Sequence, residues 1–265
     1  MGPKVVETIA DLKASLSLNT GSEASVGFVP TMGALHKGHA SLVTRARREN
    51  DLVVVSVFVN PTQFNDPRDL EKYPRTREAD LEVLSKNGAD VVWFPLFDEI
   101  YADAYRYQVQ ETELSRVLCG RSRPGHFTGM LSVVTKLLQL VRPSKAYFGE
   151  KDFQQLELVR GLVKSFFIPT DIVACETARD EAGLALSSRN ARLSPTGLAT
   201  ARSFARELAR DERNIATVRA ALARLPLEID YLEDLNGRRF AAVMIEGVRL
   251  IDNRPLAFIA KEISP

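Results

Sequence analysis

The stretch PTMGALHKGH, residues 30–39, contains residue types that could bind a ligand or take part in catalysis. Two of the three histidines in 265 residues, His36 and His39, stand there three positions apart, beside Gly33 and Gly38. A histidine titrates near neutral pH and can donate a hydrogen bond or a proton to a phosphate. From residue type and spacing alone, the pair could bind a phosphate, support the structure or ligate a metal. The H-E-x-x-H form of a zinc protease is absent, and no nearby cysteine completes a metal site.

The elements around this stretch predict where the histidines lie. Apolar runs at 26–29 and 52–59 indicate buried strands, and residues 39–50 between them carry apolar side chains at helical spacing. Such a βαβ unit implies a parallel sheet, whose ligands bind at the carboxyl ends of the strands. A helix N-terminus there offers N–H groups and partial positive charge. We therefore expect a helix to begin near Gly38, with both histidines facing one phosphate.

The same alternation continues along the first two-thirds of the chain. Helices are predicted at 78–90, 128–142 and 152–165, and strands at 91–95, 145–149 and 170–175. The prediction is an α/β fold, a Rossmann-like doubly wound parallel sheet, over residues 1–178. Residues 179–265 are predicted to form a smaller α+β lid domain, with helices at 194–208 and 214–225. Short strands follow between 228 and 253, with Asn236-Gly237 as a hairpin turn.

Composition narrows the functional classes. The net charge of +1 and the lack of a basic stripe argue against nucleic acid, and 45% hydrophobic residues are ordinary for a soluble globular protein. Two distant cysteines favour a reducing cytoplasmic setting. The longest apolar run, 52–59, is far shorter than the roughly 20 residues of a membrane-spanning helix. Neither G-x-x-x-x-G-K-[ST] nor G-x-G-x-x-G occurs, which disfavours a P-loop and an ordinary dinucleotide site.

Several motifs, taken together, resemble one family. H-x-G-H after a first strand resembles the HIGH-type signature of the nucleotidyltransferase superfamily. The full set resembles the pantothenate synthetase, or pantoate–β-alanine ligase, family in that family's order. The motifs of this set are FVPTMGALHKGHASLV (28–43), FVNPTQF (58–64), GRSRPGHFTGM (120–130), YFGEKDFQQL (147–156), LALSSRN (184–190) and RLIDN (249–253). The resemblance covers nearly the whole chain.

The resemblance implies an ATP-dependent condensation of pantoate with β-alanine. Pantoate and ATP would give pantoyl adenylate and pyrophosphate, and the amine of β-alanine would then release pantothenate and AMP. Mg²⁺ would accompany the ATP, and the protein would be a cytoplasmic homodimer joined through the N-terminal domain, without nucleic-acid or membrane partners. Pantoate is already ionised at neutral pH, so the first step needs in-line positioning and charge neutralisation rather than a base.

Site residues follow from the matching motifs. The resemblance assigns catalytic roles to His39, as the likelier proton donor, and to His36, Lys151 and Arg189. The implied ATP contacts are Met32, Gly33, Ala34, Leu35, His36, Lys37, Gly38, His39, Gly149, Glu150, Lys151, Asp152, Ala178, Leu186, Ser187, Ser188 and Arg189. Within this set, Gly149 and Asp152 would face the ribose and Ala178 the adenine. Gln63 and Gln155 would meet pantoate, with Asn60 orienting the loop.

Some questions stay open at this point. His126, beside Arg121 and Arg123, could meet the β-alanine carboxylate or the phosphates, or form salt bridges. Ala182 stands where the family usually has an acidic residue, and neighbouring Asp180 and Glu181 could compensate.

Two other functions remain as alternatives. A related nucleotidyltransferase with a phosphate acceptor would favour a cationic acceptor pocket, whereas Gln63 and Gln155 are neutral. A non-catalytic nucleotide- or RNA-binding module would not need His36, His39, Lys151 and Arg189 intact.

Overall fold

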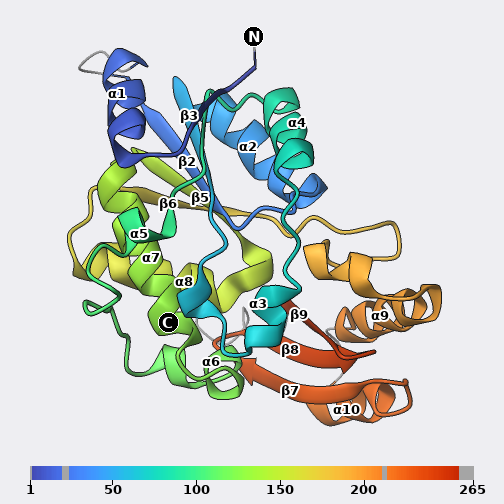
Figure 1. Ribbon diagram of the computed structural model, residues 1–265. Helices are drawn as coiled ribbons and strands as arrows, with labels where there is room; N and C mark the ends of the chain where they lie inside the picture. Colours follow the sequence, from blue (N-terminus) through green and yellow to red (C-terminus); the bar gives the residue numbers. More distant parts are fainter. Residues whose placement is uncertain (1, 20–23, 211–213, 257–265) are drawn as a thin grey trace, which may run out of the picture. The chain divides into compact units, whose positions relative to one another are not determined.

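The computed structural model describes residues 2–19, 24–210 and 214–256, and the chain forms two compact units (Figure 1). The first unit comprises residues 1–150 and 154–176. Within its described part, six parallel strands pair in the order β1-β4-β3-β2-β5-β6. Their bounds are β1 Lys4–Val6, β2 Val26–Thr31, β3 Leu52–Val57, β4 Val91–Trp93, β5 Lys145–Gly149 and β6 Asp171–Cys175.

Helices cover both faces of this sheet. The long ones are α1 (Ile9–Asn19), α2 (Lys37–Glu49), α4 (Arg77–Lys86), α7 (His126–Val141) and α8 (Phe153–Ser165); the short ones are α3 (Pro67–Glu71), α5 (Phe97–Ile100) and α6 (Cys119–Ser122). Helices α2 and α4 lie on one face and α1 and α7 on the other (Figure 1). Val29, Val53 and Val55 pack against the first pair. Phe28 and Val54 are buried as well and, because strand side chains alternate, face the second pair.

The strand order places a topological switch point between β2 and β5. From β2 the chain moves outward through β3 and β4, and it then returns to the other side of β2 as β5. The two strands are parallel neighbours, with Gly27 opposite Lys145 and Phe28 opposite Ala146. Their carboxyl ends therefore emerge at the same edge, which is where open α/β sheets bind ligands. His36 follows β2 at this edge, and the GEKD motif begins at the last residue of β5.

The second unit comprises residues 151–153 and 177–265. Strands β7 (Glu228–Leu235), β8 (Arg238–Ile245) and β9 (Val248–Pro255) form an antiparallel sheet, and Asn236 and Gly237 make the β7–β8 turn with φ of 48° and 72°. Helices α9 (Pro195–Leu208) and α10 (Ile215–Leu222) pack on one face of it through Phe204 and Leu222. Ser194 caps α9 by accepting from the Gly197 N–H at 3.1 Å.

The predicted fold class is confirmed, since a parallel α/β sheet precedes a small antiparallel α+β unit. The predicted domain limits, 1–178 and 179–265, lie close to the observed division after Glu176. The structure differs in placing residues 151–153 with the second unit, because the Phe153 ring contacts Phe240 and Arg238 there. No helix in the described ranges is long and apolar enough to cross a membrane.

Candidate active site

His36 and His39 form the N-terminus of helix α2. His36 is the N-cap, with extended backbone angles (φ −132°, ψ 178°), and its Nδ1 accepts from the Gly38 N–H at 3.1 Å. His39 reaches back, and its Nδ1 accepts from the His36 N–H at 3.3 Å. These reciprocal bonds make a capping box and bring the ring centroids to 4.2 Å. The helix therefore begins at Lys37, slightly earlier than predicted, with the two imidazoles side by side.

The capping bonds assign the tautomer of both rings. A ring nitrogen that accepts from a backbone N–H carries a lone pair, so Nδ1 is unprotonated in His36 and His39. The neutral ring then holds its proton on Nε2. Each imidazole can donate one Nε2–H hydrogen bond next to the partial positive charge of a helix N-terminus. This geometry suits an anionic oxygen.

A buried carboxylate holds the loop between β2 and the histidines. Gly33 and Ala34 both have positive φ, 82° and 50°, so the chain turns sharply after Met32. Asp80 of α4 is 2% exposed, and its two oxygens accept from the N–H groups of Ala34 at 3.1 Å and Leu35 at 2.7 Å. These two N–H groups are therefore directed at Asp80, and the predicted ATP contacts of residues 34 and 35 must come from other atoms.

Asp80 was not predicted from the sequence. A signal was present, because Asp80 stands four residues before Leu84, on the buried face of its helix. A charged residue at a buried helical position needs partners. The loop N–H groups and the Thr76 hydroxyl, at 3.2 Å, are those partners.

Gln63 lies six residues after the end of β3, in the single turn η1 (Pro61–Gln63), and is held by two side chains. Asn60, almost fully buried, donates from Nδ2 to Gln63 Oε1 at 3.1 Å. Gln63 Nε2 donates to Met32 Sδ at 2.9 Å, which ties η1 to the end of β2. Tyr101 donates its hydroxyl to Asn60 Oδ1 at 2.8 Å, and burial raises the pKa of Tyr101 to about 12. The structure thus brings together Met32, Asn60 and Gln63.

The third histidine holds the backbone of Gln63. Arg123 has only donors, so its NH1 donates to His126 Nε2 at 3.0 Å and the ring proton sits on Nδ1. Nδ1–H then donates to the Gln63 carbonyl at 2.8 Å, and Arg123 NH2 donates to the same oxygen at 3.3 Å. His126 and Arg123 therefore both bind the Gln63 loop.

The two glutamines of the DFQQ motif have different surroundings. Gln154 is buried, and its amide bonds the N–H of Cys119 at 3.1 Å and the carbonyls of Leu114 and Val117 at 2.7 and 2.8 Å. Gln155 is only partly buried. Its side chain is the one of the pair that is not enclosed in the protein interior, and its contact with pantoate stays a prediction.

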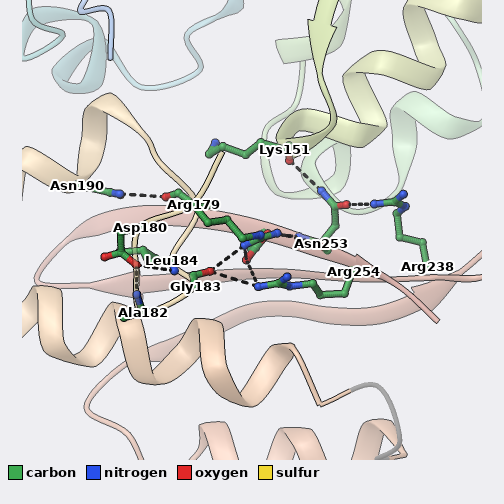
Figure 2. Close-up of polar contacts among 12 residues, drawn as sticks. Lys151, Arg179, Asp180, Ala182, Gly183, Leu184, Asn190, Arg238, Asn253 and Arg254 are labelled. Atoms are coloured by element: carbon green, nitrogen blue, oxygen red, sulfur yellow. Dashed lines mark hydrogen bonds and ion pairs between the residues drawn. The ribbon is translucent and has the colours of Figure 1, made fainter. Parts of the chain in front are cut away.

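Of the remaining predicted contacts, Gly149 and Glu150 stand at the end of β5 in the first unit, and the others belong to the second unit. Lys151 Nζ lies 3.7 Å from Asp152 Oδ2, and the Lys151 carbonyl accepts from Asn253 Nδ2 at 2.9 Å (Figure 2). Leu186 N–H donates to the Ala178 carbonyl at 2.9 Å, so two predicted nucleotide contacts are neighbours. Ser187 begins the turn η4 (Ser188–Arg192), where its hydroxyl accepts from the Arg189 N–H at 3.3 Å.

Asp180 organises the turn at Ala182, where the sequence departs from the family pattern. Its Oδ1 accepts from the N–H groups of Ala182 and Leu184, at 3.0 and 2.9 Å (Figure 2). Its Oδ2 accepts from Arg202 at 2.8 Å. Burial raises the pKa of Asp180, but these hydrogen bonds outweigh it and hold the pKa below its usual range. A carboxylate is therefore present in this turn despite Ala182.

The fold and the histidine pair define a class of protein. A doubly wound parallel sheet, with an H-x-G-H segment capping a helix at its switch point, is the arrangement of a HIGH-type nucleotidyltransferase. A family model described as pantoate-beta-alanine ligase matches residues 4–255. The chain belongs to this family, which confirms the predicted ligase and its reaction, the ATP-dependent condensation of pantoate with β-alanine through pantoyl adenylate.

Known proteins resemble the chain over most of its length. The pantothenate synthetase of Bdellovibrio bacteriovorus is 53% identical over 229 residues, 86% of this chain and 91% of that protein. The enzyme of Coxiella burnetii is 46% identical over 254 residues, 96% of this chain and 97% of that one. A crystal structure of pantoate-beta-alanine ligase from Francisella tularensis, in complex with beta-gamma ATP and beta-alanine, has a TM-score of 0.90 at 42% identity. It covers 96% of this chain and 97% of that chain.

Proposed function

We propose that this ligase forms pantoyl adenylate at the carboxyl ends of β2 and β3, with the ATP phosphates at the N-terminus of α2 and pantoate beside Gln63. The observation that carries the proposal is the pair of adjacent histidine rings, each with its Nδ1 accepting from a backbone N–H at the start of α2. ATP, pantoate and β-alanine are the proposed substrates.

In the first step a pantoate carboxylate oxygen attacks the α-phosphorus, and the bond to the pyrophosphate oxygen breaks. We assign His36 and His39 the role of hydrogen-bond donors to the charge that develops on these oxygens. Proton donation by His39, the earlier expectation, would first require protonation of Nδ1, which would break the bond from the His36 N–H. One preorganised donor of this kind contributes on the order of 10²–10³ in rate.

Pantoate carries two hydroxyls and a carboxylate around a dimethyl carbon. A neutral amide fixed in one orientation suits a hydroxyl, and Gln63 is fixed by Asn60 and Met32. Gln155 is proposed as the second amide. These neutral groups favour a hydroxy acid over the phosphate acceptor of a related nucleotidyltransferase. In the second step the unprotonated amine of β-alanine attacks the acyl carbon, and AMP leaves.

The other residues of the matching motifs are also proposed to contact ATP. Lys151 follows β5 by two residues, and its ammonium is assigned to the phosphates and the pantoate carboxylate. Ser187, Ser188 and Arg189 are assigned to the phosphates, Gly149 and Asp152 to the ribose and Ala178 to the adenine. In this proposal residues 179–265 act as a lid.

Magnesium is proposed to enter with ATP. Mg²⁺ usually takes one or two carboxylates together with phosphates and water. In the described ranges, no three histidine, cysteine or acidic side chains gather for a metal. In this proposal phosphate oxygens chiefly hold the Mg²⁺, which would neutralise phosphate charge.

A cytoplasmic homodimer is also proposed. The first unit exposes apolar side chains, among them Phe166 at 57% and Phe167 at 91% exposure. Burying such groups against a second copy would be favourable. Light scattering on the purified protein tests this: a mass of one chain at micromolar concentration contradicts the dimer.

ATP–pyrophosphate exchange tests the proposed reaction. Exchange should require pantoate and proceed without β-alanine. Exchange that starts only with a phosphate acceptor would favour the related nucleotidyltransferase, and nucleotide binding without any exchange would favour a binding module.

Two variants of His36 separate helix capping from chemistry. His36→Asn keeps a good N-cap but lacks the Nε2–H donor, so stability should hold while exchange falls ~10²–10³-fold. His36→Ala should lose the same activity and also about 1 kcal/mol of stability. Wild-type exchange by folded His36→Asn would show that the ring is only a cap.

A further inference from the structure

The RLIDN motif at 249–253 has been assigned no part in catalysis so far. Its last two residues, Asp252 and Asn253, are buried polar side chains of β9. We propose that they are positioning residues for catalysis: Asn253 sets the main chain at Lys151, and Asp252 sets the turn that carries residues 186–189. The inference rests on the proposed function of Lys151 and Arg189.

Asn253 binds the segment of Lys151 from one side. Its Nδ2 donates to the Lys151 carbonyl at 2.9 Å, and its Oδ1 accepts from Arg238 (Figure 2). The Arg238 guanidinium in turn lies over the Phe153 ring, 3.8 Å from its centroid. Residues 151 and 153 are therefore linked to β8 and β9 through Asn253 and Arg238, which fixes the point where the Lys151 side chain begins.

Asp252 binds the 179–185 turn. Its side chain is 1% exposed and takes two bonds from Arg179, NH1 to Oδ2 at 2.7 Å and NH2 to Oδ1 at 2.8 Å. Arg179 NH1 and Arg254 NH2 both donate to the Gly183 carbonyl, at 3.0 and 3.2 Å (Figure 2). Asn190 Nδ2 donates to the Ala185 carbonyl at 3.0 Å, so the turn is held at Arg179, Gly183 and Ala185 before the chain reaches Ser187.

The strand geometry explains why two adjacent residues serve two segments. Successive side chains of a strand leave on opposite faces. Val248 and Leu250 share the face of Asp252 and pack in the core with α9. Asn253 is on the other face, opposite Phe240 in the β8–β9 register, where Phe153 also packs. The strand β9 thus holds both the segment of Lys151 and the turn that leads to Arg189. Asn253 is 102 positions from Lys151 in the sequence, and Asp252 is 73 positions from Arg179.

Losing Asn253 or Asp252 would misplace the charged groups of Lys151 and Arg189 without removing them. A misplacement of about 1 Å at a reacting centre can cost ~10²-fold in rate. Removing the Asn253 donor leaves Lys151 in the chain but frees its main chain to shift. We expect kcat to fall while the variant stays folded at the assay temperature.

A double-mutant cycle in the ATP–pyrophosphate exchange assay tests the assignment of Asn253. Asn253→Asp keeps the acceptor for Arg238 and replaces the donor to the Lys151 carbonyl with a carboxylate oxygen, whereas Asn253→Ala, the second variant, removes both groups. Each should lower kcat ~10–100-fold in the wild-type background. In a Lys151→Ala background the further loss should be under ~3-fold, because residues that act as a unit are not additive.

Asp252 is tested in the same way. Asp252→Asn should lower kcat alone and add little to Arg189→Ala. Asp230→Asn is the matched control, since Asp230 pairs at 2.7 Å with Arg249, which lies on β9 like Asp252. The kcat of this variant should stay within ~2-fold of wild type. Circular dichroism melts confirm that each variant is folded.

The outcomes separate the inference from the proposed function. Additive losses in both backgrounds, or wild-type kcat in folded Asn253 variants, overturn the positioning role while leaving the proposed function intact. If Lys151→Ala itself leaves exchange unchanged, the role of Lys151 falls, and the positioning role of Asn253 falls with it.

Discussion

Replacing Asp80 with asparagine is the sharpest perturbation of the loop before the histidines. The wild-type carboxylate accepts two backbone N–H bonds, from Ala34 and Leu35, at 3.1 and 2.7 Å. Asparagine has almost the same shape but only one acceptor oxygen, so its NH₂ group must face one of the two N–H donors. Asp80→Asn therefore breaks one bond and weakens the other without creating a cavity.

The magnitude follows from the kind of bond. Hydrogen bonds to a charged group contribute about 1.5–3 kcal/mol each, and neutral ones about 0.5–1.5 kcal/mol. Losing one charged bond and converting the other to a neutral one gives a destabilisation of about 3 kcal/mol. Because the loop leads directly into His36, the same change should raise KM for ATP and lower the exchange rate ~10-fold or more.

Urea unfolding and ATP–pyrophosphate exchange measure the two effects. Asp51→Asn is the matched control, since Asp51 accepts from the Ser25 N–H at 2.9 Å and the Ser25 hydroxyl at 2.7 Å at the opposite end of the strands. This exposed control should leave exchange unchanged. If Asp80→Asn unfolds at the wild-type midpoint and exchanges normally, the carboxylate does not hold the loop.

Three further changes test the Gln63 side of the site. His126→Ala removes the bond to the Gln63 carbonyl and should raise KM for pantoate several-fold while KM for ATP holds; equal changes in both would contradict it. Gly129→Ala places a Cβ 2.2 Å from the Thr62 carbonyl oxygen, so η1 must shift; we expect about 1–3 kcal/mol of lost stability in urea melts, and a wild-type midpoint would refute the contact. Tyr101 has a folded pKa of about 12, above the ordinary value of 10.0. Its contribution is therefore complete below pH 10 and is lost between pH 10 and 12, by about 3 kcal/mol. Burial also raises the pKa of Tyr147 to about 12, so Tyr101→Phe should show a smaller loss than wild type over this range rather than none.

Local signals in the sequence were sufficient for much of the fold. The apolar runs at 26–29 and 145–149 match β2 and β5, because a strand buried on both faces has a continuous apolar pattern that depends only on its own residues. The helix start near the histidines was also predicted from local sequence, because residues 39–50 carry apolar side chains at helical spacing. The edge strand β1 and the helix α1 were missed, since three residues beside charged ones give no clear periodicity.

Long-range contacts could not be predicted in this way. Asp80 contacts Ala34 across 46 positions, and Asn253 contacts Lys151 across 102. Neither pairing has a local signature, because each depends on the register of strands and helices that meet only in the folded chain. The placement of Lys151 with the second unit has the same origin.

Some features of the candidate site were likewise determined by the sequence, and others only by the tertiary structure. Residue types and motif order determined the family, the histidine pair and the neutral amide at Gln63, because these are properties of the chain itself. Only the tertiary structure decided which ring nitrogens of His36 and His39 carry protons and which groups hold Gln63 and Lys151. A proton's position and a side chain's orientation depend on the hydrogen-bond partners that folding brings within about 3 Å.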